Sequence, residues 1–368
     1  MNQFIKRLPF IVMLCCCLHS SFAQHEPRYV DASSLLIVGK AKTTDSVYRR
    51  IDSIDRSPMP DAVKRLAQQS AGIAILFETN STSIRTQWKL DGEVHMSNMT
   101  PIGHSGLDLY CLKDGQWQFV SVGRPGTGTQ QSQLIVGNMD SSLKQFMLYL
   151  PLYNGMSALQ IGIDGQATIQ KPAKPGINQS RRVVVYGSSV VQGASAGRPG
   201  MAYPAILQRR TGMDVINLGF SGSAKMEPEL ATYLATVPAD CYVLDCIPNP
   251  SPEQIRERSY PFIKSLREKQ PSTPIVIVET IFRQNGLWDR KIGETVRQQN
   301  EAIKTTYERL KAEGMKDLYY IQSSQLIGED HEATIDGIHL TDLGFMRIAD
   351  AILPVIKKAL AAKPKKTH

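Results

Sequence analysis

The second half of the chain alternates between two hydrophobic patterns. Apolar runs of strand length begin near Arg182, Asp214, Tyr242, Ile275 and Leu318. Between them, apolar residues recur with helical spacing, which predicts helices over residues 201–210, 228–235, 252–269, 288–313 and 342–360. Strands that alternate with helices are typical of a parallel sheet covered on both faces, so we expect an α/β domain over residues 181–360.

The first half has a different pattern, in which short runs rich in β-forming residues are separated by Gly, Asn, Asp and Ser. These runs occupy residues 71–77, 83–90, 117–120 and 145–150. This spacing is typical of a β-sandwich, which we expect over residues 24–170. A stretch rich in proline and lysine follows, and it predicts a linker over residues 171–180.

The first 23 residues have the pattern of a targeting segment. Lys6 and Arg7 precede an apolar stretch over residues 8–18, and small residues surround Ala23. We therefore expect residues 1–23 to be a cleaved signal peptide, and the protein to be secreted or periplasmic. The apolar stretch is too short to span a bilayer. A lipoprotein is the less favoured alternative, because bulky Leu14 precedes the first of three adjacent cysteines.

The formal net charge of +8 is concentrated at the two ends of the chain. Two basic residues in the leader and five lysines after Asp350 leave a net charge of +1 for the rest, and residues 361–368 form a basic tail. A nucleic-acid-binding protein carries its basic residues on a folded face. The distribution therefore argues against a nucleic-acid partner.

Three cysteines remain after the leader, namely Cys111, Cys241 and Cys246. An odd number offers no disulfide framework. Cys241 and Cys246 lie five residues apart on one expected strand and so face opposite sides, which predicts buried free thiols. No Cys/His spacing indicates zinc, and we expect neither a metal nor another cofactor. The acidic run around His331 is interpreted as a solvated loop, with a metal site as the alternative.

A candidate nucleophile stands at the end of the first expected parallel strand. Gly187-Ser188-Ser189 follows the apolar run 182–186, and open parallel sheets hold their chemistry outside the carboxyl ends of the strands. A serine needs a base, and His339 lies three residues after Asp336, a spacing that lets the carboxylate orient the imidazole. The alternative for this pair is a capped turn before the last helix.

Two other strand ends offer donors for an oxyanion. Gly222 ends a glycine-containing turn after the strand near Asp214, so its backbone N–H is unshielded by a side chain. Asn249 is flanked by two prolines that restrict its backbone, after the strand near Tyr242. Each segment taken alone is equally compatible with an ordinary turn.

Taken together and in this order, these segments resemble the SGNH (GDSL-type) hydrolases. The resemblance implies that Ser189 is the nucleophile, His339 the base and Asp336 its orienting acid. It also implies an oxyanion hole formed by the Ser189 N–H, Gly222 and Asn249. The sequence departs from the family pattern in having Ser188 in place of aspartate and 247–250 in place of Gly-x-Asn-Asp.

Residues 106–110, Gly-Leu-Asp-Leu-Tyr, resemble the signature of a subfamily with an additional N-terminal domain. The resemblance implies a three-layer, flavodoxin-like parallel-sheet domain preceded by a jelly-roll-like β-sandwich. It also implies a serine esterase that hydrolyses short acyl esters, with acetyl the favoured group and carbohydrate the favoured carrier. An acyltransferase with the same triad and a non-catalytic carbohydrate-binding protein are the alternatives.

The roles of several other residues stay open in the sequence. Arg198 is a candidate substrate contact, or it packs against the sandwich, and Asp108 is expected to brace the junction between the domains. Aromatic residues of the sandwich either stack on sugar rings or, as the favoured interpretation, form its core. They are Trp88, Tyr110, Trp117, Tyr149 and Tyr153.

Overall fold

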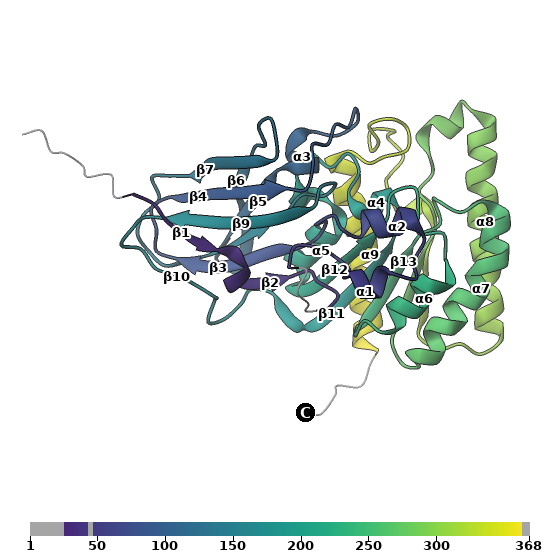
Figure 1. Ribbon diagram of the computed structural model, residues 1–368. Helices are drawn as coiled ribbons and strands as arrows, with labels where there is room; N and C mark the ends of the chain where they lie inside the picture. Colours follow the sequence, from purple (N-terminus) through teal and green to yellow (C-terminus); the bar gives the residue numbers. More distant parts are fainter. Residues whose placement is uncertain (1–25, 43–46, 363–368) are drawn as a thin grey trace, which may run out of the picture.

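The computed structural model describes residues 26–42 and 47–362. The predicted signal peptide and most of the basic tail lie outside these ranges. Two regions of different architecture are visible in Figure 1, an antiparallel β-sandwich on the left and a parallel sheet flanked by helices on the right. The expected fold class, an α/β domain preceded by a sandwich, is confirmed.

The sandwich consists of two antiparallel sheets. The first has the order β1 (Arg28–Asp31), β9 (Met156–Ile163), β4 (Ile84–Leu90) and β7 (Gln130–Val136). The second has the order β10 (Ile169–Gln170), β3 (Ala74–Thr79), β8 (Lys144–Tyr149), β5 (Leu107–Lys113) and β6 (Gln116–Gly123), with β2 (Leu36–Val38) on β3.

The aromatic residues of the sandwich belong to its core and its interface. Trp88 packs between the two sheets, whereas Tyr110 and Tyr149 lie on the outer face of the second sheet against Ala205 of the α/β domain. Tyr153 is also buried and Trp117 is half-buried. The packing interpretation was therefore the right one, since buried rings cannot stack on a ligand.

The α/β domain contains a five-stranded parallel sheet in the order β12-β11-β13-β14-β15. In chain order this is 2-1-3-4-5, the flavodoxin-like arrangement. The strands are β11 (Asn178–Gly187), β12 (Met213–Gly219), β13 (Cys241–Asp245), β14 (Ile275–Val278) and β15 (Leu318–Ile321). Most of their residues are buried, because helices cover both faces.

The helices divide between the two faces of this sheet. α5 (Tyr203–Thr211) and α9 (Asp342–Ala361) pack on one face, and α6 (Pro228–Ala235), α7 (Pro252–Lys269) and α8 (Arg290–Ala312) on the other. Cys241 belongs to the first of these cores and Cys246 to the second. Both are buried free thiols, as predicted, whereas Cys111 is half-buried.

The N-terminal region is not confined to the sandwich. α1 (Ser53–Arg56) and α2 (Asp61–Leu66) lie beside the parallel sheet in Figure 1. Ile51, Met59 and Val63 of this region share a hydrophobic core with Tyr186 and Phe220. The expected domain 24–170 therefore contributes two short helices and their flanking residues to the core of its neighbour, which the run of short strand patterns did not reveal.

Several predicted boundaries shift for local reasons. α6 and α7 begin and end where expected, but α8 begins at Arg290, because Asp289 caps it by accepting from the N–H of Lys291 (3.0 Å). α5 follows a 3-10 turn, η2 (Pro199–Met201). β11 starts at Asn178, inside the expected linker, because Asn178 already pairs with Met213 of β12.

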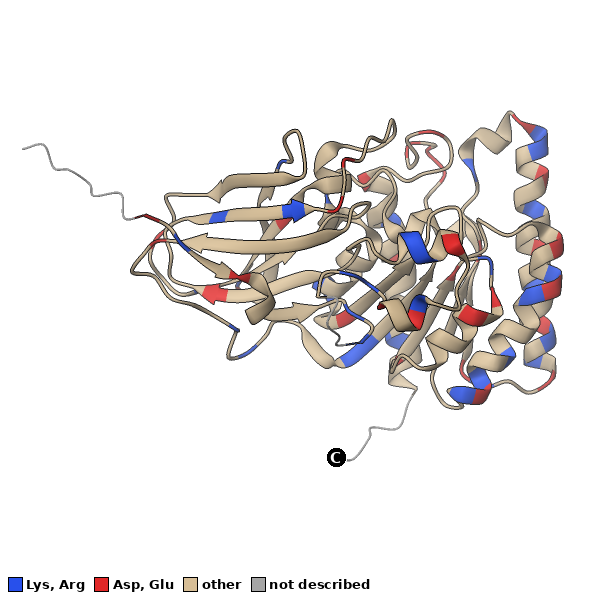
Figure 2. Ribbon diagram, viewed as in Figure 1, with Lys and Arg blue, Asp and Glu red and all other residues tan. Residues whose placement is uncertain are grey.

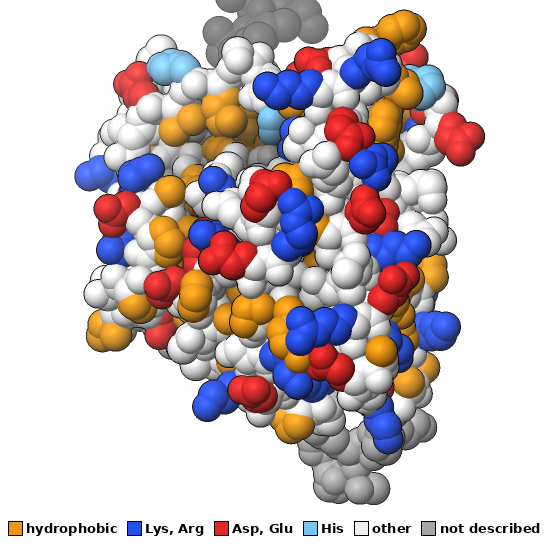
Figure 3. Space-filling view, turned by 90° about the vertical axis from the view of Figure 1, so that its right-hand side faces the viewer, with side chains coloured by type: hydrophobic (Ala, Val, Ile, Leu, Met, Phe, Trp, Pro, Cys, Tyr) orange, Lys and Arg blue, Asp and Glu red, His pale blue; other side chains and the backbone are white. Residues whose placement is uncertain are grey.

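Charged side chains on the described surface are mixed in sign. Basic and acidic residues alternate along α8 (Figure 2), and both signs are interspersed over the face that carries α7 and α8 (Figure 3). Within residues 26–42 and 47–362, no helix is long and apolar enough to cross a membrane.

Candidate active site

The candidate nucleophile sits at a sharp turn between β11 and α4 (Ser189–Gln192). Gly187 is required there, because a Cβ atom at this position would lie 2.1 Å from the carbonyl oxygen of Asp245 on β13. Ser188 is buried and caps α4, its Oγ accepting from the N–H of Val190 (3.3 Å). Ser189 begins the helix and retains 8% exposure. Of the two serines, Ser189 therefore faces the site and Ser188 the turn.

The loop before α9 brings the expected base to this serine. His339 Nε2 lies 3.2 Å from Ser189 Oγ, and His339 Nδ1 lies 2.7 Å from Asp336 Oδ2. Because an ionised carboxylate can only accept, Nδ1 carries the ring hydrogen and Nε2 is left to accept from the serine hydroxyl. The three residues thus form one hydrogen-bonded chain.

Asp336 is held in the ionised form. Burial alone would raise the pKa of this carboxyl group, but donated hydrogen bonds outweigh it and lower the pKa below its usual value. Oδ1 accepts from the N–H groups of His339 (2.7 Å) and Ile338 (3.0 Å), and Oδ2 accepts from the imidazole. The capped-turn alternative is also present here, and the same carboxylate performs both tasks.

Gly222 lies in a turn that follows β12. Its φ of +66° is in the left-handed region, and a Cβ atom there would meet nothing within 4 Å. The turn is closed by the N–H of Ser223, which donates to the carbonyl of Phe220 (2.9 Å), and the N–H of Ser221 donates to Gln192 Oε1 of α4 (3.0 Å). The space in front of Gly222 is therefore open, while the turn itself is tied to the nucleophile helix.

Asn249 is placed beside this turn, but its amide has partners. Nδ2 donates to the carbonyl of Phe220 (3.3 Å) and to that of Ser223. The loop that carries it is fixed from behind, because Arg283 and Gln299 donate to the carbonyls of its prolines. In this arrangement Asn249 anchors the Gly222 turn, so a direct bond from its amide to an oxyanion requires it to leave one of these carbonyls.

Arg198 is engaged at the domain junction. Its guanidinium donates to Asp108 Oδ2 (2.8 Å) and to the hydroxyl of Tyr110, and it stacks on Phe119 with 4.2 Å to the ring centroid. Asp108 also accepts from the N–H of Gly200 (2.8 Å). The structure thus favours the alternative in which Arg198 packs against the sandwich, since its Nη1 hydrogen bonds and its ring contacts are all to sandwich residues. Asp108 braces the junction as expected.

Two further residues at the site were not identified from the sequence. Gln192 Nε2 donates to Gln69 Oε1 (2.5 Å) and to the carbonyl of Leu152 (3.1 Å), which ties α4 to the N-terminal region. Arg50 is buried and donates to the carbonyl of Gly219 at the end of β12 (2.5 Å). A polar residue in the apolar run 190–194 was the only available signal for Gln192.

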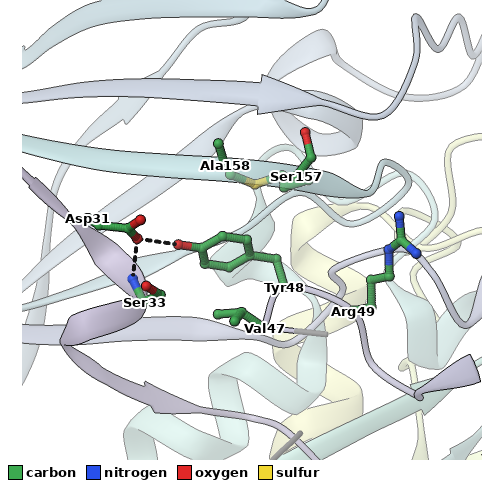
Figure 4. Close-up of a pocket in the computed structure, with 8 residues that line it drawn as sticks. Asp31, Ser33, Val47, Tyr48, Arg49, Ser157 and Ala158 are labelled. Carbon is green, nitrogen blue, oxygen red and sulfur yellow. Dashed lines mark hydrogen bonds between the residues drawn. The ribbon is translucent and has the colours of Figure 1, made fainter. Parts of the chain in front are cut away.

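The structure contains one cavity next to this site and another away from it. One of about 900 Å³ is lined by η3 (Gln284–Leu287), the first half of α8 and the loop 322–331. It adjoins the loop of the base, because Thr334 donates to Gln284 there. Another of about 390 Å³ lies within the N-terminal region, where Tyr48 points toward Asp31 (Figure 4).

In the described ranges no group of three or more His, Cys, Asp or Glu is placed to hold a metal, and Asp330 of the acidic run pairs with Arg347 (2.6 Å).

Sequence comparisons cover both halves of the chain. The model of the GDSL-like lipase/acylhydrolase family matches residues 180–357. The model described as the N-terminus of SGNH-hydrolase-type esterases, named for Gly-x-Asp-Leu-Tyr, matches residues 27–169. No curated protein matches the chain.

Solved structures with the same two-domain fold include a protein from Bacteroides ovatus described as a GDSL-like lipase. It is 46% identical, with a TM-score of 0.88, and the match covers 92% of this chain and 99% of that one. A salicylyl-acyltransferase from a tetracycline biosynthetic pathway is 20% identical (TM-score 0.72, 92% and 98% covered). A family two carbohydrate esterase from Cellvibrio japonicus is 13% identical (TM-score 0.58, 91% and 98% covered), and these last two likenesses concern the fold alone.

Identity at this level over nearly the whole chain shows a shared family, and the two family matches divide the chain between them. The protein therefore belongs to the GDSL-like lipase/acylhydrolase family, carries the N-terminal domain of the SGNH-type esterases, and is an ester-hydrolysing enzyme.

Proposed function

We propose that the protein is a serine esterase that removes short acyl groups, acetyl in particular, from carbohydrate outside the cytoplasm. The observation that carries the proposal is the chain of hydrogen bonds from Asp336 through His339 to Ser189, with 2.7 and 3.2 Å between the paired atoms. Nucleophile, base and orienting acid are all within the reach that this chemistry requires.

In this scheme Ser189 Oγ attacks the acyl carbon while His339 Nε2 takes the hydroxyl proton. The N–H groups of Ser189 and Gly222 donate to the oxyanion that forms, and Asn249 holds the turn that carries Gly222. Collapse breaks the ester C–O bond, and His339 returns the proton to the leaving alcohol. A water molecule, deprotonated by His339, then attacks the acyl-enzyme, which releases the carboxylic acid and restores Ser189.

Four points support the finer parts of the proposal. Ser189 is only 8% exposed, which suits a small acyl group. Trp288 is 87% exposed and directly follows η3, whose Asn285 lies against Gly337 in the loop of the base, so a flat indole is available for a sugar ring close to the site. The predicted signal peptide supports export, and the carbohydrate esterases of similar fold support the substrate class.

Acyl transfer is a second candidate, because one protein of the same two-domain fold is named as a salicylyl-acyltransferase. Transfer and hydrolysis share the acyl-enzyme and differ in the acceptor. Adding a simple alcohol to the assay separates them: a transferase makes more ester product at the expense of free acid, whereas an esterase releases acid throughout.

The test of the main proposal measures acetate release by purified protein from 4-nitrophenyl acetate and from an acetylated xylo-oligosaccharide. We expect both to be cleaved, with the higher kcat/KM for the oligosaccharide. Cleavage of the chromogenic ester alone would retain the esterase chemistry and overturn the carbohydrate assignment. Failure on both, with no labelling of Ser189 by a fluorophosphonate, would overturn the triad assignment itself.

A further inference from the structure

One side chain of the N-terminal domain reaches the acid and base of the candidate triad. Asn98 lies between β4 and α3 (Pro101–Ser105), and its Nδ2 is 3.4 Å from Asp336 Oδ2 and 3.4 Å from His339 Nδ1. The two contacts join residues more than 230 positions apart in the sequence. The sandwich domain thus contributes a polar group to a site built by the other domain.

The segment that presents Asn98 is anchored on both sides. Met99 is buried in the core of the α/β domain, and Met96 packs against the same core. Thr100 donates from Oγ1 to the carbonyl of Gly197 (2.7 Å), in the loop that follows the nucleophile helix. Gly197 in turn donates its N–H to Asp342 (2.8 Å), at the start of α9. Asn98 is therefore held against a fixed surface.

The donors and acceptors present show which of the two Asn98 contacts, to Asp336 or to His339, is a hydrogen bond. An amide Nδ2 can only donate, and His339 Nδ1 already donates its hydrogen to Asp336. The partner of Asn98 is therefore the carboxylate oxygen, Asp336 Oδ2. That oxygen receives hydrogen from the imidazole on one side and faces the Asn98 amide on the other.

We infer that Asn98 is a positioning residue that acts on the base through Asp336, an inference that rests on the proposed function. The amide fixes the plane of the carboxylate and draws negative charge away from the imidazole. Removing the amide leaves the carboxylate freer to rotate and gives more of its charge to the protonated ring. The base should then lose its proton at higher pH and be less well aligned for proton transfer.

Asn98→Ala removes the amide without adding bulk, and we expect it to lower kcat for 4-nitrophenyl acetate by roughly 3- to 10-fold, the size of one partly exposed hydrogen bond to a charged group. The midpoint of the rise of kcat/KM with pH should move upward by a few tenths of a pH unit. Asn98→Asp places a second carboxylate beside Asp336 and should move the midpoint further, by roughly one unit. KM should change little, because Asn98 acts through Asp336.

The matched control is Ser97→Ala, the exposed neighbour of Asn98. Other titratable groups on the surrounding elements stay in place in every variant, namely Glu93, His95, His104 and Asp342. A second readout needs no ester: the pH dependence of Ser189 labelling by a fluorophosphonate follows the same base. Thermal melting of each variant shows that it is folded.

The outcomes separate the inference from the function beneath it. A midpoint that moves in both Asn98 variants and stays fixed in Ser97→Ala supports the inference. Active variants with unchanged midpoints overturn it and leave the esterase assignment standing. Wild-type protein that neither hydrolyses ester nor reacts with the fluorophosphonate overturns the proposed function and the inference together.

Discussion

Two aspartates at the carboxyl edge of the parallel sheet show how differently the two sides of the site are built. Asp336 lies on the loop before α9, its side chain 36% exposed, and donated hydrogen bonds lower its pKa. Asp245 ends β13, is buried, and accepts a hydrogen bond from the hydroxyl of Tyr203 (2.8 Å). Burial outweighs that bond and raises the pKa of Asp245 to about 7.

The two aspartates differ because the nucleophile side of the site and the loop that carries the base are held in place in different ways. The nucleophile and the Gly222 turn rest on buried strand ends that the core fixes, and Arg50, Gln192 and Asn249 tie the remaining main chain. Ala333 and Leu340 anchor the two ends of the loop of the base in the core, and between them the positions of Ile338 and His339 depend on hydrogen bonds to Asp336. Substitutions that remove a hydrogen bond in the loop should therefore lower the rate, whereas substitutions that untie the main chain around the nucleophile, such as Asn249→Ala, should also lower stability.

The largest effect is expected at the nucleophile. Ser189→Ala removes the attacking oxygen and should lower kcat/KM for an ester by roughly 10³-fold or more, with little change in melting temperature. Ser188→Ala is the control on the same turn. It removes the cap of α4 and should cost about 1 kcal/mol of stability while the rate is kept. An active Ser189→Ala protein together with an inactive Ser188→Ala protein would move the nucleophile to Ser188.

Asp336→Asn should lower kcat by roughly 10²- to 10⁴-fold, because an amide can present a donor to the ring and no longer holds its tautomer. In the wild type the lowered pKa keeps Asp336 ionised well below neutrality, so kcat/KM should rise with pH in a single limb rather than two. Asp330→Asn, an exposed acid paired with Arg347, is the control and should leave the rate unchanged.

Asn249→Ala tests the hydrogen bonds that hold the Gly222 turn. Because the amide donates to the carbonyls of Phe220 and Ser223, we expect both a lower melting temperature and a kcat reduced by roughly 10²-fold as the Gly222 turn shifts. Asn249→Asp should be worse on both counts, since a negatively charged carboxylate with no hydrogen to donate would face the carbonyl oxygens of Phe220 and Ser223 and repel them. If the rate per folded molecule equals that of the wild type, Asn249 is only a turn residue. If the rate falls while the melting temperature is unchanged, Asn249 donates directly to the oxyanion.

The sequence predicted the parts of the site that depend on local pattern. Ser189, Asp336 and His339 stand at strand and helix ends that periodicity locates, and the structure brings their side chains together. Contacts between distant segments left no such pattern. The buried position of Arg50, the bridge from Gln69 to Gln192 and the approach of Asn98 to Asp336 arise only when the N-terminal region packs on the parallel sheet.

Arg198 shows the same limit of local sequence patterns for a residue that the sequence did single out. A basic residue in a loop nine positions after the nucleophile was compatible with a substrate contact, and nothing nearby in the chain indicated its partners. Asp108 and Tyr110, which bind it, lie about 90 positions earlier on β5. Its role is set by the docking of the two domains, which local sequence patterns do not encode.

The smallest effect on rate and the clearest effect on stability are expected at Asp245. Between about pH 4, where an aspartate of the unfolded chain titrates, and about pH 7, the folded protein binds a proton that the unfolded chain has lost. Asp245 should therefore cost stability progressively as the pH rises through this range, by at most about 4 kcal/mol.

Asp245→Asn removes the ionisation, so its free energy of unfolding relative to wild type should increase from pH 4.5 to pH 7.5 in urea titrations. Tyr203→Phe takes away the donor that favours the ionised form, which raises the folded-state pKa further and should extend the loss to higher pH. A difference between Asp245→Asn and wild type that is constant across this range would mean that Asp245 is ionised in the folded protein, and the contrast with Asp336 would then fail.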